Sequence, residues 1–150
     1  MRPLPAYSLS KNMNSITVYI DGASRGNPGH AGVGVAIYDE SGNNIKNVKK
    51  YIGKTTNNVA EYSALIAALD EAEQLGVQNI KIFLDSELVY KQFTGEYKTK
   101  DENLKILLAA IRNKVKNFKT LEIMHIPREK NKEADKLANI AVNLGETGGG

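Results

Sequence analysis

The chain has 150 residues, of which 41% are hydrophobic and 25% are charged, a composition typical of one globular domain. The absence of cysteine excludes disulfides and thiolate metal sites, and no apolar run approaches the roughly 20 residues that cross a membrane. The net charge of +3 favours polyanionic partners only mildly. We expect a cytoplasmic monomer without a membrane segment or a signal peptide.

The sequence predicts one domain with a short tail at each end. Residues 1–14 hold two prolines and few apolar residues, and residues 146–150 include three glycines, so we expect both tails to be disordered. The predicted domain spans residues 15–145.

An alternating strand opens this domain. Apolar and polar side chains alternate over residues 16–21, and the strand is expected to end at Asp21, before a glycine-rich loop. An acid at this position is placed to bind a cation or to lie beside a phosphate. The alternative is that Asp21 and Gly22 only turn a hairpin, and this stretch alone leaves both interpretations open.

The later elements are first strands and then alternating helices and strands. Strands predicted at 32–38 and 45–53 complete an antiparallel meander, and a helix at 58–75 ends at Gly76. The remaining elements are a strand at 80–84, helices at about 86–93 and 101–118, a strand at 121–126, and a last helix at about 130–144 that ends at Gly145.

These elements predict an α/β fold built on one mixed five-stranded sheet. Because a strand–helix–strand crossover is right-handed and gives parallel neighbours, the economical strand order is 3-2-1-4-5. The second strand is then antiparallel to its neighbours, and helices cover both faces. The first and fourth strands lie side by side and parallel, about 4.8 Å apart.

This topology brings acidic residues together. Asp21 and Asp85 end adjacent parallel strands, at the edge where open sheets bind ligands, and two carboxylates there repel unless a divalent cation lies between them. Glu61 lies on the apolar, sheet-facing side of its helix, where an unpaired charge is costly. The alternative role for Glu61 is a capping box with Asn58, and the two roles are compatible.

Asp135 is a fourth candidate, beside the apolar stripe of the last helix. The alternative is an acid of the first turn that the helix dipole stabilises. Carboxylate oxygens without cysteine or a histidine cluster indicate Mg²⁺ or Mn²⁺. Several carboxylates can hold two such ions about 4 Å apart, as in phosphoryl transfer. The residues alone therefore predict metal-dependent phosphodiester chemistry.

Positive charge is concentrated in segment 98–119, which carries seven lysine and arginine residues against two acids. One interpretation is a solvated helix face. The other is a basic rim that binds phosphates and is formed by Lys98, Lys100 and Lys105.

Four motifs carry a resemblance to type 1 ribonuclease H. They are DGASRGNPG at 21–29, TNNVAEY at 56–62, DS at 85–86 and NKEAD at 131–135. They occur in the order of that family, and the resemblance covers residues 16–143. It implies the ribonuclease H-like fold and an endonuclease that cuts the RNA strand of an RNA/DNA hybrid, leaving 5′-phosphate and 3′-hydroxyl ends.

The resemblance also implies roles for single residues. Asp21, Glu61, Asp85 and Asp135 would be the catalytic ligands of two Mg²⁺ ions, with Mn²⁺ as a substitute. One ion would activate the attacking water, and the other would stabilise the departing 3′ oxygen. The positions implied in substrate binding are Gly22, Asn27, Thr56, Asn57, Asn58, Ser86 and Glu87, among which Thr56 and Asn57 would reach the DNA strand. Polar groups across the minor groove distinguish the RNA strand by its 2′-hydroxyl.

The chain departs from many family members in two places. They place a histidine that aids product release in a loop before the final helix; here that loop has none, and Arg128 or Glu129 would substitute for it. Their tryptophan- and lysine-rich DNA grip is also missing, since segment 94–102 is short and the chain has no tryptophan. The basic rim, joined by Arg128, would do part of that work. This short form resembles the archaeal-like branch of the family.

Three other functions compete with this prediction. The first is a catalytically silent hybrid-binding module, which the four acids disfavour because a binder of polyanions gains nothing from buried like charges. The second is another nuclease of the superfamily, such as a 3′→5′ exonuclease or an integrase-like core, which lacks the NPG and TNN motifs. The third is the nuclease domain of a reverse transcriptase polyprotein, over which the loose tails lead us to expect a free-standing protein.

Overall fold

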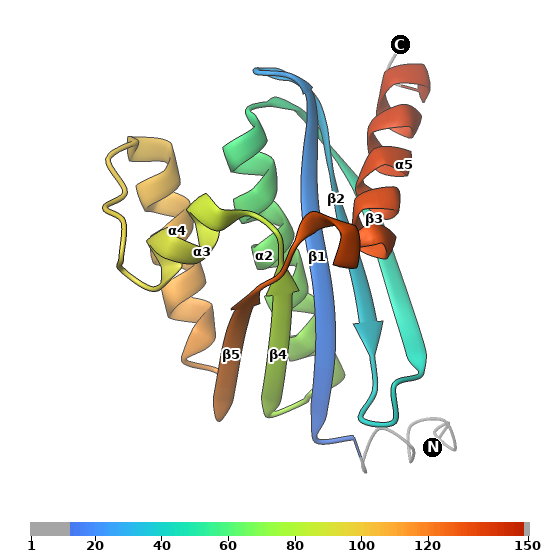
Figure 1. The fold of residues 1–150 in the computed structure, drawn as a ribbon, viewed down its shortest axis with the longest axis vertical. Coiled ribbons are helices and arrows are strands. Elements are labelled where there is room, and N and C mark those ends of the chain that lie inside the picture. The colour runs from blue at the N-terminus through green and yellow to red at the C-terminus, as the bar shows by residue number, and fades with distance from the viewer. Residues whose placement is uncertain (1–12, 149–150) are drawn as a thin grey trace.

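The computed structural model describes residues 13–148, which form one sheet with helices on both faces (Figure 1). Most of the expected N-terminal tail, residues 1–12, lies outside the described residues, as do residues 149–150. Met13 packs against the core, and the Asn14 carbonyl accepts hydrogen bonds from the amides of Gln78 and Asn79. No helix within 13–148 is long and apolar enough to cross a membrane.

The five strands adopt the predicted order, β3-β2-β1-β4-β5. They are β1 (Ser15–Gly26), β2 (Gly29–Tyr38), β3 (Asn44–Thr55), β4 (Asn79–Leu84) and β5 (Thr120–His125). The second strand is antiparallel to β1 and β3, whereas β4 is parallel to both β1 and β5. The predicted fold class, including the antiparallel second strand, is therefore confirmed.

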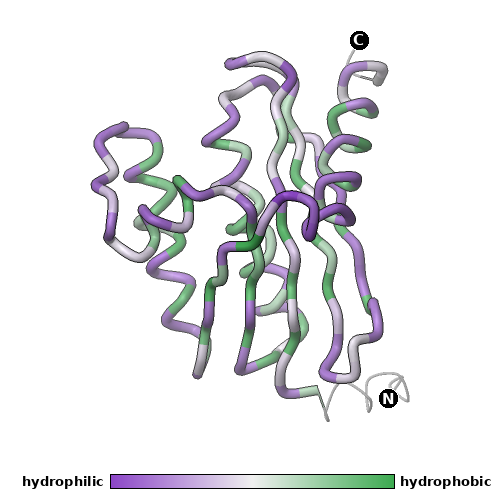
Figure 2. The backbone as a smooth tube through the Cα atoms, in the orientation of Figure 1, coloured by the Kyte–Doolittle hydropathy of each residue, from purple (hydrophilic) through white to green (hydrophobic). Residues whose placement is uncertain are grey.

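Within the described residues 13–148, four α-helices pack around this sheet. They are α2 (Asn57–Leu75), α3 (Glu87–Phe93), α4 (Glu102–Val115) and α5 (Lys132–Gly148), and a single 3₁₀ turn, η1 (Arg128–Lys130), precedes α5. In Figure 1, α2 lies behind the sheet, α4 lies beside β5 and packs against α2, and α5 lies in front of β2 and β3. Apolar residues recur along the strands in Figure 2, and the main core lies between the sheet and α2, where Val18, Leu65 and Ile82 are fully buried.

The prediction that the first strand ends at Asp21, before a loop, is wrong. The strand continues to Gly26, and only Asn27 and Pro28 separate it from β2. Two glycines, Gly22 in the expected loop and Gly34 in the predicted strand 32–38, instead allow helices to approach the sheet closely. A Cβ atom on Gly22 would lie 2.2 Å from the carbonyl carbon of Ala60 in α2, and one on Gly34 would lie 2.2 Å from the Ala134 oxygen in α5.

Two helix ends also differ from the prediction. The N-cap of α2 is Thr56, whose hydroxyl accepts the Val59 amide at 3.2 Å, so Asn58 is not the cap and forms no capping box with Glu61. The last helix does not stop at Gly145, which packs against the Tyr51 ring, and it continues to Gly148. Residues 146–148, expected to belong to the disordered tail, are therefore helical.

Candidate active site

The difference in length between β1 and β4 creates the site. The parallel ladder between these strands ends at the pair Tyr19 and Phe83, and the chain leaves the sheet after Leu84. Beyond that pair, the edge of β1 is free on this side, and its backbone groups need other partners. Asp21 lies on this free stretch, and Asp85 follows directly after β4.

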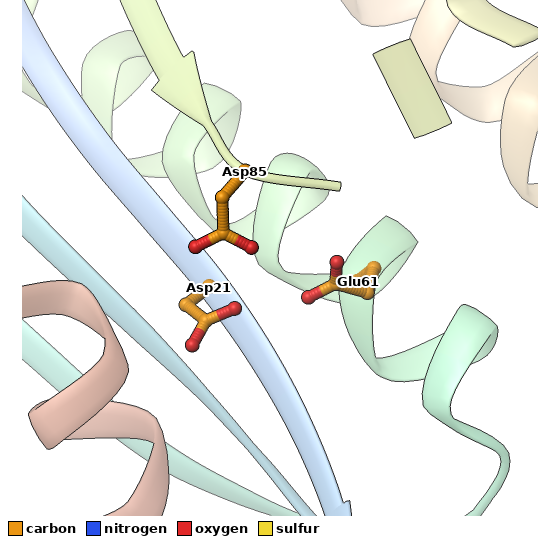
Figure 3. A group of neighbouring side chains, drawn as sticks. All are labelled: Asp21, Glu61 and Asp85. Carbon is orange, nitrogen blue, oxygen red and sulfur yellow. The ribbon is translucent and has the colours of Figure 1, made fainter. Parts of the chain in front are cut away.

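Glu61 reaches the same edge from α2. Its Oε1 atom accepts a hydrogen bond of 2.8 Å from the Gly22 amide. The close approach of α2 over Gly22 makes this bond possible. Figure 3 shows Asp21, Glu61 and Asp85 turned toward one another from three separate elements, and one oxygen of each lies within 4.8 Å of the others.

Burial and mutual repulsion shift the protonation of this cluster. Asp21 is 9% exposed and Glu61 is 8% exposed. Desolvation, followed by the charges of Glu61 and Asp85, raises the pKa of Asp21 to about 10. Desolvation also raises the pKa of Glu61, although the Gly22 hydrogen bond opposes that change. Buried carboxylates that repel one another and have raised pKa values are suited to bind a divalent cation, which would relieve the repulsion.

Asp135 lines the same cavity but stands slightly apart from the other three. The cavity has a volume of about 280 Å³, and its walls include Asp21, Glu61, Asp85, Asp135 and Arg128. Asp135 lies in the first turn of α5, and it is not among the acids whose oxygens approach within 4.8 Å. It is half-buried and faces the cavity, so the structure brings all four predicted carboxylates to one place.

Two asparagines with no role predicted from the sequence hold these acids, and one of them begins the NKEAD motif. The Asn131 side-chain amide donates to the Ile20 carbonyl at 2.8 Å and to Asp85 Oδ2 at 2.9 Å, and Asn131 is only 1% exposed. Asn139 donates to the backbone oxygen of Asp135 at 2.9 Å and to its Oδ1 at 3.3 Å. The spacing of four residues on one helix could have indicated the second contact, whereas nothing local in the sequence indicates the first.

Residues predicted to bind substrate form a corner where the tip of the β1–β2 hairpin meets α2. Asn27 Oδ1 accepts the Asn57 amide at 3.0 Å, which ties the hairpin tip to the first turn of the helix. Thr56 caps the helix, Asn58 follows in the first turn, and Asn57 and Gly22 line the cavity of carboxylates. The structure therefore groups these positions, and their contacts with substrate stay predictions.

The other predicted substrate residues are less clearly directed toward the cavity. The Ser86 hydroxyl caps α3 by accepting the Val89 amide at 3.2 Å. It also opposes the rise in the pKa of Glu61, which places it beside that acid. Glu87 is exposed, pairs with Lys91 at 3.1 Å and does not line the cavity.

The basic rim lies over α4 and the segment before it. Lys98 and Lys105 line a shallow groove of about 380 Å³ together with Arg112, and Lys100 is exposed nearby. The Lys105 ammonium pairs with Glu102 at 3.0 Å, so part of its charge is already neutralised. Arg128 instead lies at the carboxylate cavity, whereas Glu129 is exposed and does not line it. His125 ends β5, where its Nε2 lies 3.3 Å from the Asp85 backbone oxygen.

Comparison with known proteins identifies the family. A family model described as reverse transcriptase-like matches residues 19–141. This chain belongs to the reverse transcriptase-like family. It is 43% identical over 128 residues to ribonuclease HI of Halobacterium salinarum, covering 85% of this chain and 64% of that protein. It is 38% identical to the bifunctional protein Rv2228c of Mycobacterium tuberculosis, covering 85% and 35%. The chain thus spans less than two thirds of the length of these family members.

Solved structures of the family agree with the fold. The crystal structure of the Halobacterium salinarum RNase H1 superposes with a TM-score of 0.84, covering 86% of this chain and 98% of that one. LC11-RNase H1, solved in complex with an RNA/DNA hybrid, is 45% identical and gives a TM-score of 0.81, covering 85% and 96%. The resemblance to type 1 ribonuclease H is confirmed.

The raised pKa of Asp21 predicts a pH-dependent stability in EDTA. Because the folded protein holds this proton more tightly than the unfolded chain, the contribution is complete below about pH 4 and is lost as pH rises toward 10. The thermal unfolding temperature should therefore decrease as pH rises from 5 to 9, by about 2–4 °C for each kcal/mol of stability that is lost. The Asp21→Asn variant should flatten this dependence and unfold at a higher temperature at pH 9. Asp101→Asn, an exposed N-cap that asparagine also caps, should leave the slope unchanged; equal slopes for all three proteins would contradict the prediction.

Asn131 is predicted to support both the fold and the orientation of Asp85. Asn131→Ala leaves the Ile20 carbonyl without its side-chain partner, so the free energy of unfolding should fall by about 1–3 kcal/mol. Urea denaturation measures this change, and Asn113→Ala, at an exposed position of α4, serves as the control. Identical urea midpoints for Asn131→Ala and the wild type would show that the hydrogen bonds of Asn131 do not stabilise the fold.

Proposed function

We propose that this chain is an endonuclease that hydrolyses the RNA strand of RNA/DNA hybrids and leaves 5′-phosphate and 3′-hydroxyl ends. The observation that carries the proposal is the convergence of Asp21, Glu61 and Asp85 within 4.8 Å, from three separate elements, in a cavity that Asp135 also lines. The proposal is supported by relatives named ribonuclease HI and by LC11-RNase H1, which was solved with a hybrid.

The same four carboxylates are proposed to hold two Mg²⁺ ions, with Mn²⁺ as a substitute. Their fit rests on the chemistry of the donors, because buried carboxylate oxygens without sulfur suit small, hard divalent cations. Such ions supply a water of lowered pKa and stabilise the negative charge of the leaving oxygen. The requirement for a cation also follows from the raised pKa of Asp21, which repulsion and burial leave poorly ionised by itself.

The protein's own groups keep these ligands in position. The Gly22 amide fixes Glu61, the Asn131 amide fixes Asp85, and Asn139 fixes Asp135. Three ligands are thus oriented by hydrogen bonds before any ion arrives, which reduces the reorganisation that binding requires. Arg128 offers a positive charge at the cavity wall, where it would bind a phosphate oxygen and take the place of the absent loop histidine.

Recognition of the hybrid is proposed to use the corner formed by Asn27, Thr56, Asn57 and Asn58. These uncharged groups can contact the sugar-phosphate backbone and the 2′-hydroxyl across the minor groove without reading base sequence. Ser86, beside Glu61, belongs to the same surface, and the basic rim would bind phosphates farther along the DNA strand. We also propose that the protein acts in the cytoplasm as a monomer.

A catalytically silent hybrid-binding module is the main alternative. It would share the corner and the basic rim, but it would have no use for three carboxylates buried against one another. Such a cluster destabilises the fold unless a cation compensates it. The closeness of these acids therefore favours the enzyme over the silent module.

Substitution of one cluster acid tests the activity. Asp21→Asn keeps the shape of the side chain but removes its charge, so Mg²⁺-dependent cleavage of a labelled hybrid should fall by roughly 1,000-fold or more. The wild type should cut the hybrid with Mg²⁺, leave matched duplex DNA intact and be inactive in EDTA. Retained cleavage by Asp21→Asn would remove the proposed mechanism, and hybrid binding without cleavage by the wild type would favour the silent module.

The basic rim is tested by the salt dependence of hybrid affinity. Replacing Lys98, Lys100 and Lys105 by glutamine should reduce the magnitude of the negative slope of log affinity against log salt by about 2. The expected change is about 2 and not 3 because Lys105 already pairs with Glu102. Lys46, Lys49 and Lys50 of β3, replaced together, provide a matched change of charge elsewhere, since Lys46 also pairs with an acid, Glu71. If both triple variants change the slope equally, the rim has no specific role.

A further inference from the structure

Among residues 13–148, the elements that pack on one face of the sheet cover it only partly. Helix α5 packs on β1, β2 and β3, and Figure 1 shows no helix in front of β4 and β5 on that side. A row of large side chains crosses the uncovered area: Tyr38, Tyr19, Phe83 and Met124. The register places Tyr19 beside Phe83 and Phe83 beside Met124, so these side chains point to the same face.

Contacts within this row keep it rigid. The rings of Tyr19 and Phe83 are stacked, with centroids 4.9 Å apart, and Tyr38 meets Tyr19 edge-on at 5.7 Å. Met124 is 40% exposed at the far end of the row. The row therefore forms an ordered apolar strip that spans four strands and reaches solvent.

A cavity lies at the Tyr38 end of this strip. It has a volume of about 480 Å³ and lies between the strip, the turn after β2 and the start of α5. Tyr19 and Tyr38 form its aromatic wall, and its charged residues are Asp39, Glu40, Lys130 and Glu133. None of the four carboxylates of the candidate active site lines it.

The charges make this cavity negative. Three acids face one lysine, and the pKa of Asp39 is held low, first by the hydrogen bond from the Asn43 amide, so that this group stays ionised. Burial and the nearby Glu133 charge raise the pKa of Tyr38. The cavity therefore repels phosphates, although the chain as a whole carries a net charge of +3.

We propose that this cavity binds an arginine side chain from a peptide segment of a partner protein, whose adjacent apolar residues lie on the strip of Tyr19, Phe83 and Met124. A guanidinium group suits the cavity because it can stack on a tyrosine ring while its N–H groups pair with carboxylates. A peptide suits the strip because the distance from β1 to β5, two strand spacings or about 10 Å, matches about three residues of extended chain.

The site adjoins the candidate active site through one residue. Asn131 lines the cavity, and its side-chain amide also donates to Asp85. A partner bound here would lie next to the loop that carries Asn131 and leave the carboxylates free. The proposal does not depend on the proposed nuclease activity, because it concerns a separate surface and its test measures binding.

Binding is tested by amide chemical shifts of the ¹⁵N-labelled chain titrated with acetyl-Leu-Arg-Leu-amide. Saturable shifts should appear at Tyr19, Tyr38, Gly42 and Met124 with a dissociation constant of about 1 mM or below. The same peptide with citrulline, a neutral isostere of arginine, should bind at least about fivefold more weakly. Agmatine, a free guanidinium compound without the leucines, should also bind more weakly than the arginine peptide.

Variants of the acids locate the site. Glu40→Gln combined with Glu133→Gln changes two exposed groups and should weaken the arginine peptide at least about fivefold, whereas Glu129→Gln, outside the cavity, should have no effect. The proposal is overturned by the absence of shifts at about 10 mM peptide, by equal binding of the citrulline peptide, or by binding unaffected in the double variant. Equal affinity for agmatine would show that the ligand is a small guanidinium compound and would overturn the peptide assignment.

Discussion

The hydrogen bond from the Gly22 amide to the Glu61 carboxylate is the contact on which the candidate active site depends. It joins the free edge of β1 to the second turn of α2, at a point where any side chain on residue 22 would collide with the helix backbone. The bond can form only because α2 lies this close to the strand. The same closeness carries Glu61 into contact range of Asp21 and Asp85, so helix packing and the geometry of the acids have one cause.

The free edge of β1 explains why polar residues gather there. Ile20 and Gly22 have the same orientation on the strand, and their backbone groups point toward the place that β4 leaves after Leu84. Side chains supply the hydrogen-bond partners of both backbone groups: Asn131 donates to the Ile20 carbonyl, and Glu61 accepts from the Gly22 amide. These residues satisfy the sheet edge and position the acids at the same time. Removing either one therefore affects stability as well as the site.

The sequence was sufficient for the topology and for the neighbourhood of the acids. Alternation within strands and the right-handed crossover rule gave the strand order, and the parallel pairing of β1 with β4 then placed Asp21 beside Asp85. Composition gave a wrong prediction where a glycine allows a helix to pack closely on the sheet instead of forming a turn. Gly22 suggested the start of a loop, yet it lies within a strand that a helix crosses closely. The role of Asn131 could not be predicted, because its partners Ile20 and Asp85 are 111 and 46 residues away.

If the proposed cation binds Asp135, its binding would be coupled to the docking of α5. This acid lies in the first turn of α5, where the helix dipole stabilises its negative charge, and the helix itself rests on Gly32 and Gly34 of β2. Asp135 also raises the pKa of Asp21 through a side-chain hydrogen bond, which favours the protonated form of Asp21 when no cation is bound. A cation that binds all four carboxylates would reverse this effect and hold the start of α5 against β1. Because such binding favours the folded state by mass action, the carboxylates that weaken the metal-free fold would become a link between its two faces.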